Sequence, residues 1–75
     1  MAFTILGRKG CSYCVKAEET LKKMGVLFNK FDIVEQPALT DFLISCGLQT
    51  VPQIYVGSKH IGGYDDLLKF LESWD

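Results

Sequence analysis

The chain has 75 residues, of which 48% are apolar and 23% are charged, and its formal net charge is −1. A chain of this length forms one domain, residues 1–75, and the near-neutral charge disfavours nucleic acid or an anionic membrane surface as a partner. No apolar run approaches the roughly 20 residues of a membrane-spanning helix, and the N-terminal sequence lacks the features of a secretory signal peptide. We therefore expect a cytoplasmic monomer.

The first half of the chain predicts a strand, a helix and a second strand. Residues 2–6 are rich in β-formers and end at a glycine, which is typical of a buried strand. Residues 12–24 predict a helix that ends at Gly25. Its apolar residues recur at helical spacing: Cys14, Ala17, Leu21 and Met24. The second strand is expected at 26–33.

The second half predicts a helix, a hairpin and a last helix. Pro37 stands at a first helical position, before a stripe that ends at Gly47: Leu39, Phe42, Leu43 and Cys46. Two short strands are expected at 53–56 and 59–61. The last helix carries its apolar residues on one side: Tyr64, Leu67, Leu68, Leu71 and Trp74. The order βαβαββα indicates an α/β domain with a parallel βαβ unit followed by antiparallel strands.

Two of the three cysteines form a Cys-x-x-Cys pair at the start of the first helix. An odd cysteine count argues against a disulfide-stapled secreted domain, and in a reducing cytosol such a pair is catalytic or metal-binding. The positive end of the helix, with Arg8 and Lys9 nearby, favours the thiolate form of Cys11. Cys14 lies one turn further on the apolar stripe. The pair therefore offers an exposed attacking thiol and a shielded resolving thiol.

A structural zinc site is the competing interpretation of the pair. Cys11, Cys14, Cys46 and His60 together would supply four ligands. However, Cys46 falls on the apolar face of its helix, where a cysteine packs as a small buried hydrophobic residue. His60 stands alone at a strand end, as an ordinary surface or turn residue does, and no second Cys-x-x-Cys is present. The pattern therefore favours a redox pair, with no metal assigned.

Three separated motifs, CSYC at 11–14, TVPQIYV at 50–56 and HIGGYDDL at 60–67, resemble the glutaredoxins in order and spacing. The resemblance covers about residues 3–71. It implies a thioredoxin fold with a central four-stranded mixed sheet flanked by three helices. It also implies a glutathione-dependent thiol–disulfide oxidoreductase, in which Cys11 is the nucleophile and Cys14 the resolving thiol.

The resemblance further implies where glutathione binds. Pro52 matches the family's cis-proline, which would place Val51 beside Cys11, so that the Val51 backbone pairs with the cysteinyl backbone of glutathione. The glycines of the third motif permit a close approach before the last helix. The N–H groups of Tyr64 and Asp65 would then meet the glutamyl carboxylate. Asp65 would pair with the amino group and cap the helix, while Asp66 complements the helix dipole as a first-turn acid.

Two positions depart from the usual family pattern. Arg8 stands where lysine is more usual. It would bind the glycine carboxylate of glutathione with altered geometry, because an arginine can bind a carboxylate through two hydrogen bonds. Gln49 replaces a common basic residue and would supply a neutral hydrogen bond. Tyr13 is expected to be exposed and to pack against the ligand. The full expected glutathione-binding set is Arg8, Tyr13, Gln49, Thr50, Val51, Pro52, Gly63, Tyr64 and Asp65.

The expected substrates are protein disulfides and glutathionylated proteins, with ribonucleotide reductase as a candidate partner. One alternative is a hydrogen donor recharged by thioredoxin reductase rather than by glutathione. A second is a dimer that shares a [2Fe-2S] cluster through Cys11 of each subunit and two glutathiones. That alternative depends on Ser12, because a proline there would stiffen the loop and remove an N–H group. A simpler expectation is that the Ser12 hydroxyl caps the helix.

Overall fold

The computed structural model describes residues 2–74. Its seven elements follow the predicted order. They are β1 (Phe3–Gly7), α1 (Ser12–Lys23), β2 (Phe28–Asp32), α2 (Pro37–Ser45), β3 (Gln53–Val56), β4 (Lys59–Gly62) and α3 (Tyr64–Glu72). The strand bounds agree best at 53–56, and the largest difference is at the second strand, predicted at 26–33 and observed at 28–32.

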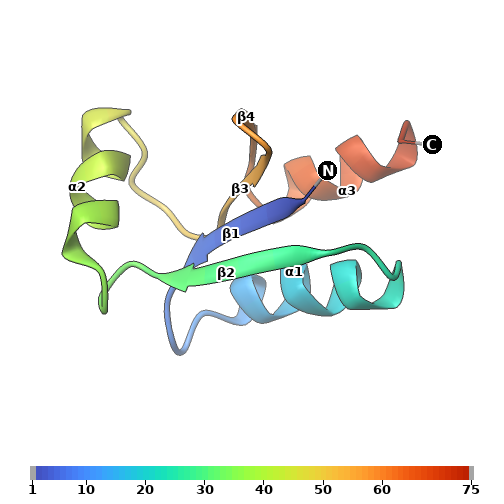
Figure 1. Cartoon of the computed structure of the whole chain (residues 1–75), viewed down its shortest axis with the longest axis horizontal. Helices are drawn as coiled ribbons and strands as arrows, with labels where there is room; N and C mark the ends of the chain where they lie inside the picture. The colour runs from blue at the N-terminus through green and yellow to red at the C-terminus, as the bar shows by residue number, and fades with distance from the viewer. Residues whose placement is uncertain (1, 75) are drawn as a thin grey trace.

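The four strands form one mixed sheet in the order β2-β1-β3-β4 (Figure 1). β1 runs parallel to β2, with Phe3 opposite Phe28, and antiparallel to β3, with Ile5 opposite Ile54. β3 and β4 form an antiparallel hairpin whose register shifts after Ile54. The predicted mixed sheet flanked by three helices, with a parallel βαβ unit followed by antiparallel strands, is confirmed.

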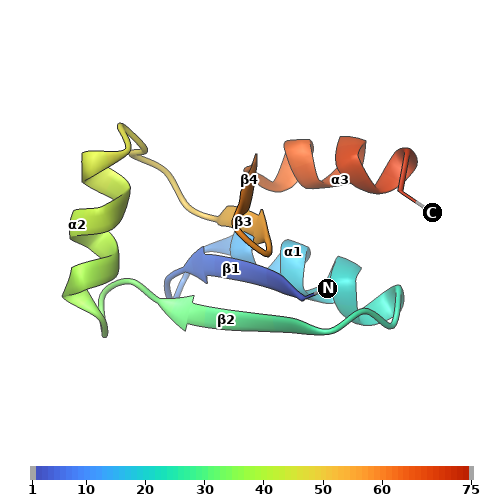
Figure 2. The same ribbon diagram turned by 45° about the horizontal axis from the view of Figure 1, so that its top comes forward.

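The core lies between one face of the sheet and the pair of helices α1 and α3 (Figure 2). Strand alternation turns every second residue of β1 and β3 toward these helices. The buried cluster consists of Phe3, Ile5, Ala17, Leu21, Ile54, Val56 and Leu67. The Phe3 ring also meets Phe70 and Trp74 edge-on, at centroid distances of 6.1 and 5.4 Å. Each fully buried large side chain stabilises the fold by about 1.5–3 kcal/mol.

Helix α2 stands at the end of the sheet where β1 and β2 finish, apart from the other two helices (Figure 1). Its one buried residue is Leu43, while Phe42 is 44% exposed and reaches the Tyr55 ring at 6.4 Å. Cys46, at the C-cap, is exposed. The expectation of a buried Cys46 is therefore wrong. A helix that crosses the end of a sheet buries only the position that faces it, not a whole apolar stripe.

Two other expected core residues are also exposed. Met24 is the C-cap of α1, where the chain turns at Gly25 with φ +70°, and this leaves Met24 beyond the last packed turn. Leu68 follows the fully buried Leu67 in α3, and successive helical residues point about 100° apart, so Leu68 faces solvent. Within residues 2–74, no helix has the length and apolarity needed to cross a membrane.

Candidate active site

Cys11 is the N-cap residue of α1 and has an extended backbone, with φ −94° and ψ 109°. Its Sγ accepts a hydrogen bond from the backbone N–H of Cys14 at 3.1 Å. The cap is therefore a sulfur, and the expectation that the Ser12 hydroxyl caps the helix is wrong. Ser12 is instead the first helical residue. An N–H donor and the positive end of a helix dipole both stabilise negative charge on the partly exposed Cys11 sulfur.

Cys14 lies one turn along α1 and is only 4% exposed, as its place on the apolar stripe predicts. β1 approaches it closely, since a Cβ added at Gly7 would lie 2.8 Å from the Cys14 Sγ. Burial, with a further contribution from the hydrogen bond with Cys11, raises the pKa of the Cys14 thiol to about 12, although a hydrogen bond with the Arg8 backbone opposes the shift. Cys14 is therefore protonated at neutral pH.

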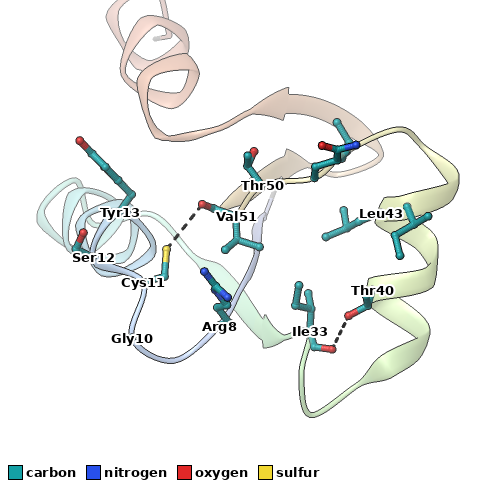
Figure 3. Close-up of a pocket in the computed structure, with 13 residues that line it drawn as sticks. Arg8, Gly10, Cys11, Ser12, Tyr13, Ile33, Thr40, Leu43, Thr50 and Val51 are labelled. Atoms are coloured by element: carbon teal, nitrogen blue, oxygen red, sulfur yellow. Dashed lines mark hydrogen bonds between the residues drawn. The ribbon is translucent and has the colours of Figure 1, made fainter.

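The segment before β3 passes directly over Cys11. The Val51–Pro52 peptide bond is cis. The Cys11 thiol donates a long hydrogen bond to the Val51 carbonyl oxygen, with an S···O distance of 3.8 Å (Figure 3). Pro52 itself is buried, whereas Val51 is half-buried. The structure thus places the Val51 backbone beside the Cys11 sulfur.

A groove of about 660 Å³ opens between this segment, the β1–α1 loop and α2 (Figure 3). Seven of the residues singled out as functional candidates in the sequence line it: Arg8, Cys11, Ser12, Tyr13, Gln49, Thr50 and Val51. Its far wall is apolar and comes from Ile33, Leu43, Ile44 and Leu48. The Thr40 hydroxyl anchors that wall by donating to the Ile33 carbonyl at 2.9 Å. The sequence did not reveal the apolar wall, because it depends on where α2 packs.

The start of α3 lies close to two residues near Cys11, namely Tyr13 and Pro52. The Tyr64 ring is 5.9 Å from the ring of Tyr13, and a Cβ at Gly63 would lie 3.7 Å from the Pro52 carbonyl oxygen. Gly63 is the N-cap, and the Asp66 carboxylate accepts a hydrogen bond from the Gly63 N–H at 3.1 Å. The expected capping role of Asp65 is therefore wrong; Asp65 is exposed at the second helical position.

Gln53 supports the groove through Thr50 and is not among the expected site residues. It is 5% exposed, and its side-chain amide donates to the Thr50 carbonyl at 2.9 Å and to the Thr50 hydroxyl at 3.2 Å. Its oxygen lies 2.7 Å from Nε2 of His60, which must therefore donate. His60 is exposed, as expected of a surface residue, and it also supports the segment that faces Cys11. A polar residue at the start of an otherwise apolar strand was the available signal.

Two lysines near the site contact other side chains at the surface. Lys9 forms an exposed ion pair with Glu35 at 3.5 Å, and the Lys16 ammonium lies 4.8 Å from the centroid of the Tyr13 ring. Among residues 2–74, no cluster of three or more His, Cys, Asp or Glu side chains is arranged to hold a metal ion. Of the two cysteines of the pair, Cys11 lines this groove.

Comparison with known proteins gives a consistent answer. The glutaredoxin family model matches residues 3–61. Glutaredoxin 3 of Escherichia coli is 39% identical over 64 residues, which cover 84% of this chain and 77% of that protein. The structure of reduced Escherichia coli glutaredoxin superposes with a TM-score of 0.80 at 35% identity, covering 96% of this chain and 94% of that one. A hybrid peroxiredoxin of Haemophilus influenzae is 35% identical, but the chain spans only 29% of its length.

Proposed function

This chain belongs to the glutaredoxin family, and we propose that it uses glutathione to reduce protein disulfides and glutathione mixed disulfides. Membership of the family makes it a thiol–disulfide oxidoreductase with a thioredoxin fold. The observation that carries the proposal is the unequal pair of cysteines. Cys11 is partly exposed, and its sulfur accepts a hydrogen bond from a backbone N–H group, while Cys14 is buried and protonated. The Cys11 sulfur is suited to attack a substrate disulfide, and the Cys14 sulfur is suited to react in the later, resolving step.

In the proposed reaction the Cys11 thiolate attacks one sulfur of the substrate disulfide. A bond forms between Cys11 and that sulfur, the substrate disulfide breaks, and the other sulfur leaves as a thiolate that takes a proton from solvent. In the dithiol route Cys14 then loses its proton and attacks Cys11, which releases the second thiol and leaves a Cys11–Cys14 disulfide. Two glutathione molecules reduce this bond and become oxidised glutathione. In the monothiol route a glutathione attacks the Cys11–glutathione mixed disulfide directly.

We place glutathione across the groove, with its cysteinyl backbone along Val51. The glycine carboxylate would meet Arg8 and Gln49, both of which line the groove. The glutamyl carboxylate would meet the first N–H groups of α3, at Tyr64 and Asp65, which lack partners within the helix. Asp65 would pair with the glutamyl amino group. The closeness of Tyr13 to Tyr64 supports a continuous ligand path between the two ends.

Thr50, Pro52 and Gly63 have supporting parts in this binding mode. Thr50 lines the groove and is held by the buried Gln53, so its backbone position is well defined. Pro52 and Gly63 lie close together, since a Cβ at Gly63 would lie 3.7 Å from the Pro52 carbonyl oxygen. These contacts would keep the Val51 backbone and the start of α3 at a constant separation.

The test is the reduction of a small glutathione mixed disulfide with glutathione as the only reductant. The unaltered protein and Cys14→Ser should both be active, since the monothiol route needs Cys11 alone, whereas Cys11→Ser should lose at least about a hundredfold in rate. Arg8→Gln should weaken glutathione binding by about 1–2 kcal/mol, and the adjacent Lys9→Gln serves as its control, since Lys9 pairs with Glu35. Retention of activity by Cys11→Ser would refute the assignment of the nucleophile.

The proposal extends to the physiological electron donor and to the protein partner. A cytoplasmic monomer with this site would have glutathione as its reductant, and ribonucleotide reductase is one candidate among its protein partners. The rival donor is thioredoxin reductase. Parallel assays with either donor alone separate the two, because glutathione alone should sustain turnover and thioredoxin reductase alone should not. The opposite result would favour the thioredoxin-like alternative.

The cluster-binding alternative uses the same sulfur differently. Cys14 is buried, so Cys11 is the accessible cysteine that this site can offer to a [2Fe-2S] cluster. The other ligands would have to come from a second copy and two glutathiones. Anaerobic reconstitution with iron, sulfide and glutathione tests this alternative, and a colourless monomer after reconstitution would exclude it.

A further inference from the structure

A second cavity, of about 400 Å³, lies behind the active-site pair, between α1, β2 and the β1–α1 loop. Cys14 lines this cavity and Cys11 does not, whereas Cys11 lines the substrate groove and Cys14 does not. The two thiols therefore face separate spaces. The cavity also has a charged lining, made up of Arg8, Lys9, Glu18, Lys30, Asp32 and Glu35.

Glu18 is the least exposed partner among the ion-paired groups of this lining. Its side chain is 18% exposed, and Lys30 donates to its Oε1 at 3.1 Å. Its second oxygen, Oε2, accepts no hydrogen bond from any residue within 2–74. Glu18 also follows Cys14 by four residues on α1, and such pairs share one face of a helix. A half-buried carboxylate with a free oxygen thus stands one turn from the buried thiol.

The other two acids that line the cavity, Glu35 and Asp32, have other hydrogen-bond or ion-pair partners. Glu35 is 63% exposed and pairs with Lys9. Asp32 accepts hydrogen bonds from the backbone N–H groups of Val34 and Glu35, at 2.7 and 3.2 Å, and so closes the turn after β2. Glu18 is therefore the acid best placed to receive a proton from the cavity.

The chemistry of the buried thiol requires such a receiver. With its pKa raised to about 12, Cys14 is ionised in roughly one molecule in 10⁵ at pH 7, five pH units lower. Burial is the largest cause of the raised Cys14 pKa. Because burial does not depend on the Cys11 thiol, it persists when Cys11 is part of a mixed disulfide. Unassisted attack by Cys14 would be slow, because the thiolate is the nucleophile.

We propose that Glu18 accepts the Cys14 proton, through water in the cavity, during attack on the Cys11 mixed disulfide. This role rests on the dithiol route of the proposed function. The proton passes from Cys14 Sγ by way of water to the Glu18 carboxylate. The freed electron pair forms the Cys14–Cys11 bond, and the Cys11–substrate bond breaks. The departing thiolate is protonated by solvent, and the Glu18 carboxyl group later returns its proton to solvent.

The test separates the two chemical steps by stopped-flow absorbance, in a Cys46→Ser background that removes the exposed third thiol. The probe is a symmetrical aromatic disulfide whose released thiolates are coloured. Attack by Cys11 releases the first thiolate at a rate that depends on probe concentration. Resolution by Cys14 releases the second thiolate in a phase that does not depend on it. Four proteins are compared in this background: the parent, Glu18→Gln, Glu19→Gln and Lys30→Gln.

At pH 7, Glu18→Gln should slow the second phase at least about tenfold and leave the first within about twofold. Its second phase should then rise about tenfold per pH unit, since only hydroxide remains as the base, whereas the parent should depend less steeply on pH. The exposed neighbour variant Glu19→Gln should behave as the parent. Lys30→Gln removes the same ion pair but keeps the carboxylate, so it should slow the second phase by no more than about threefold.

Each outcome decides a specific point. A second phase in Glu18→Gln within about twofold of the parent would overturn the role of Glu18. Equal slowing in Glu18→Gln and Lys30→Gln would assign the effect to the ion pair and overturn it as well. Absence of any second phase in the parent would instead refute the dithiol route itself, and with it every role of Glu18 in that route.

Discussion

Replacing Gly7 by alanine tests how tightly β1 is packed against the resolving cysteine. The added Cβ would lie 2.8 Å from Cys14 Sγ and 3.3 Å from Cys14 Cβ. Non-bonded heavy atoms prefer a separation of about 3.5–4.0 Å. Relieving such an overlap in a packed core costs about 1–3 kcal/mol. Alanine in a strand recovers roughly 0.5–1 kcal/mol relative to glycine. The net loss of unfolding free energy should therefore be about 0.5–2 kcal/mol.

A double-mutant cycle by urea denaturation of the reduced protein measures this contact. In a Cys14→Ala background the sulfur is gone, so Gly7→Ala should be neutral or stabilise the fold by up to roughly 0.5 kcal/mol. The coupling free energy between the two positions should then be about 0.5–2.5 kcal/mol. An equal effect of Gly7→Ala in both backgrounds would refute the inference that overlap with the Cys14 sulfur causes the loss.

Three further predictions concern stability. Because the pKa of Cys14 is raised from 9.0 to about 12 in the folded state, the stability of the reduced protein should be unaffected by this group below pH 9 and should fall between pH 9 and pH 12, by up to about 1.4 kcal/mol per pH unit. Urea titrations of Cys14→Ala should lack this component, and identical pH profiles would contradict the burial of the thiol. Gly62→Ala should cost at least about 2 kcal/mol, because φ is +127° and a Cβ would overlap the Asp66 carboxylate. Gly57→Ala is its control, with φ +59° and open space, and should cost only about 1–2 kcal/mol, so equal losses would argue against the overlap. Cys46→Ser should change the unfolding free energy by less than about 0.5 kcal/mol, and a larger loss would show that Cys46 packs in the core.

Local signals in the sequence account well for the elements and for the environment of Cys14. Glycine and proline punctuation placed the strands and helices, since Pro37 opens α2 and Gly25 follows the end of α1. Helical spacing alone predicted that Cys14 would be buried. Both inferences depend on contacts between residues close in the chain, and such contacts follow from backbone periodicity.

Some of the features that were mispredicted depend on distant parts of the chain. The apolar stripe of α2 does not indicate which part of the protein covers it. The exposure of Cys46 therefore depends on where the helix packs, which its own sequence does not predict. The support of Thr50 by Gln53 and His60 depends on the register between β3 and β4. The capping error, by contrast, is local: α1 begins at Ser12 as predicted, and this start makes Cys11 rather than Ser12 the N-cap.

The most direct test of the central claim is to trap the first covalent intermediate. Cys14→Ser combined with Cys46→Ser leaves Cys11 as the only thiol, and this protein is treated with oxidised glutathione and analysed by mass spectrometry. We expect one glutathionyl group on Cys11, removed rapidly by added glutathione. A protein that forms no such adduct, or whose adduct glutathione does not remove, would contradict the assignment of Cys11 as the nucleophile of a glutathione-dependent oxidoreductase.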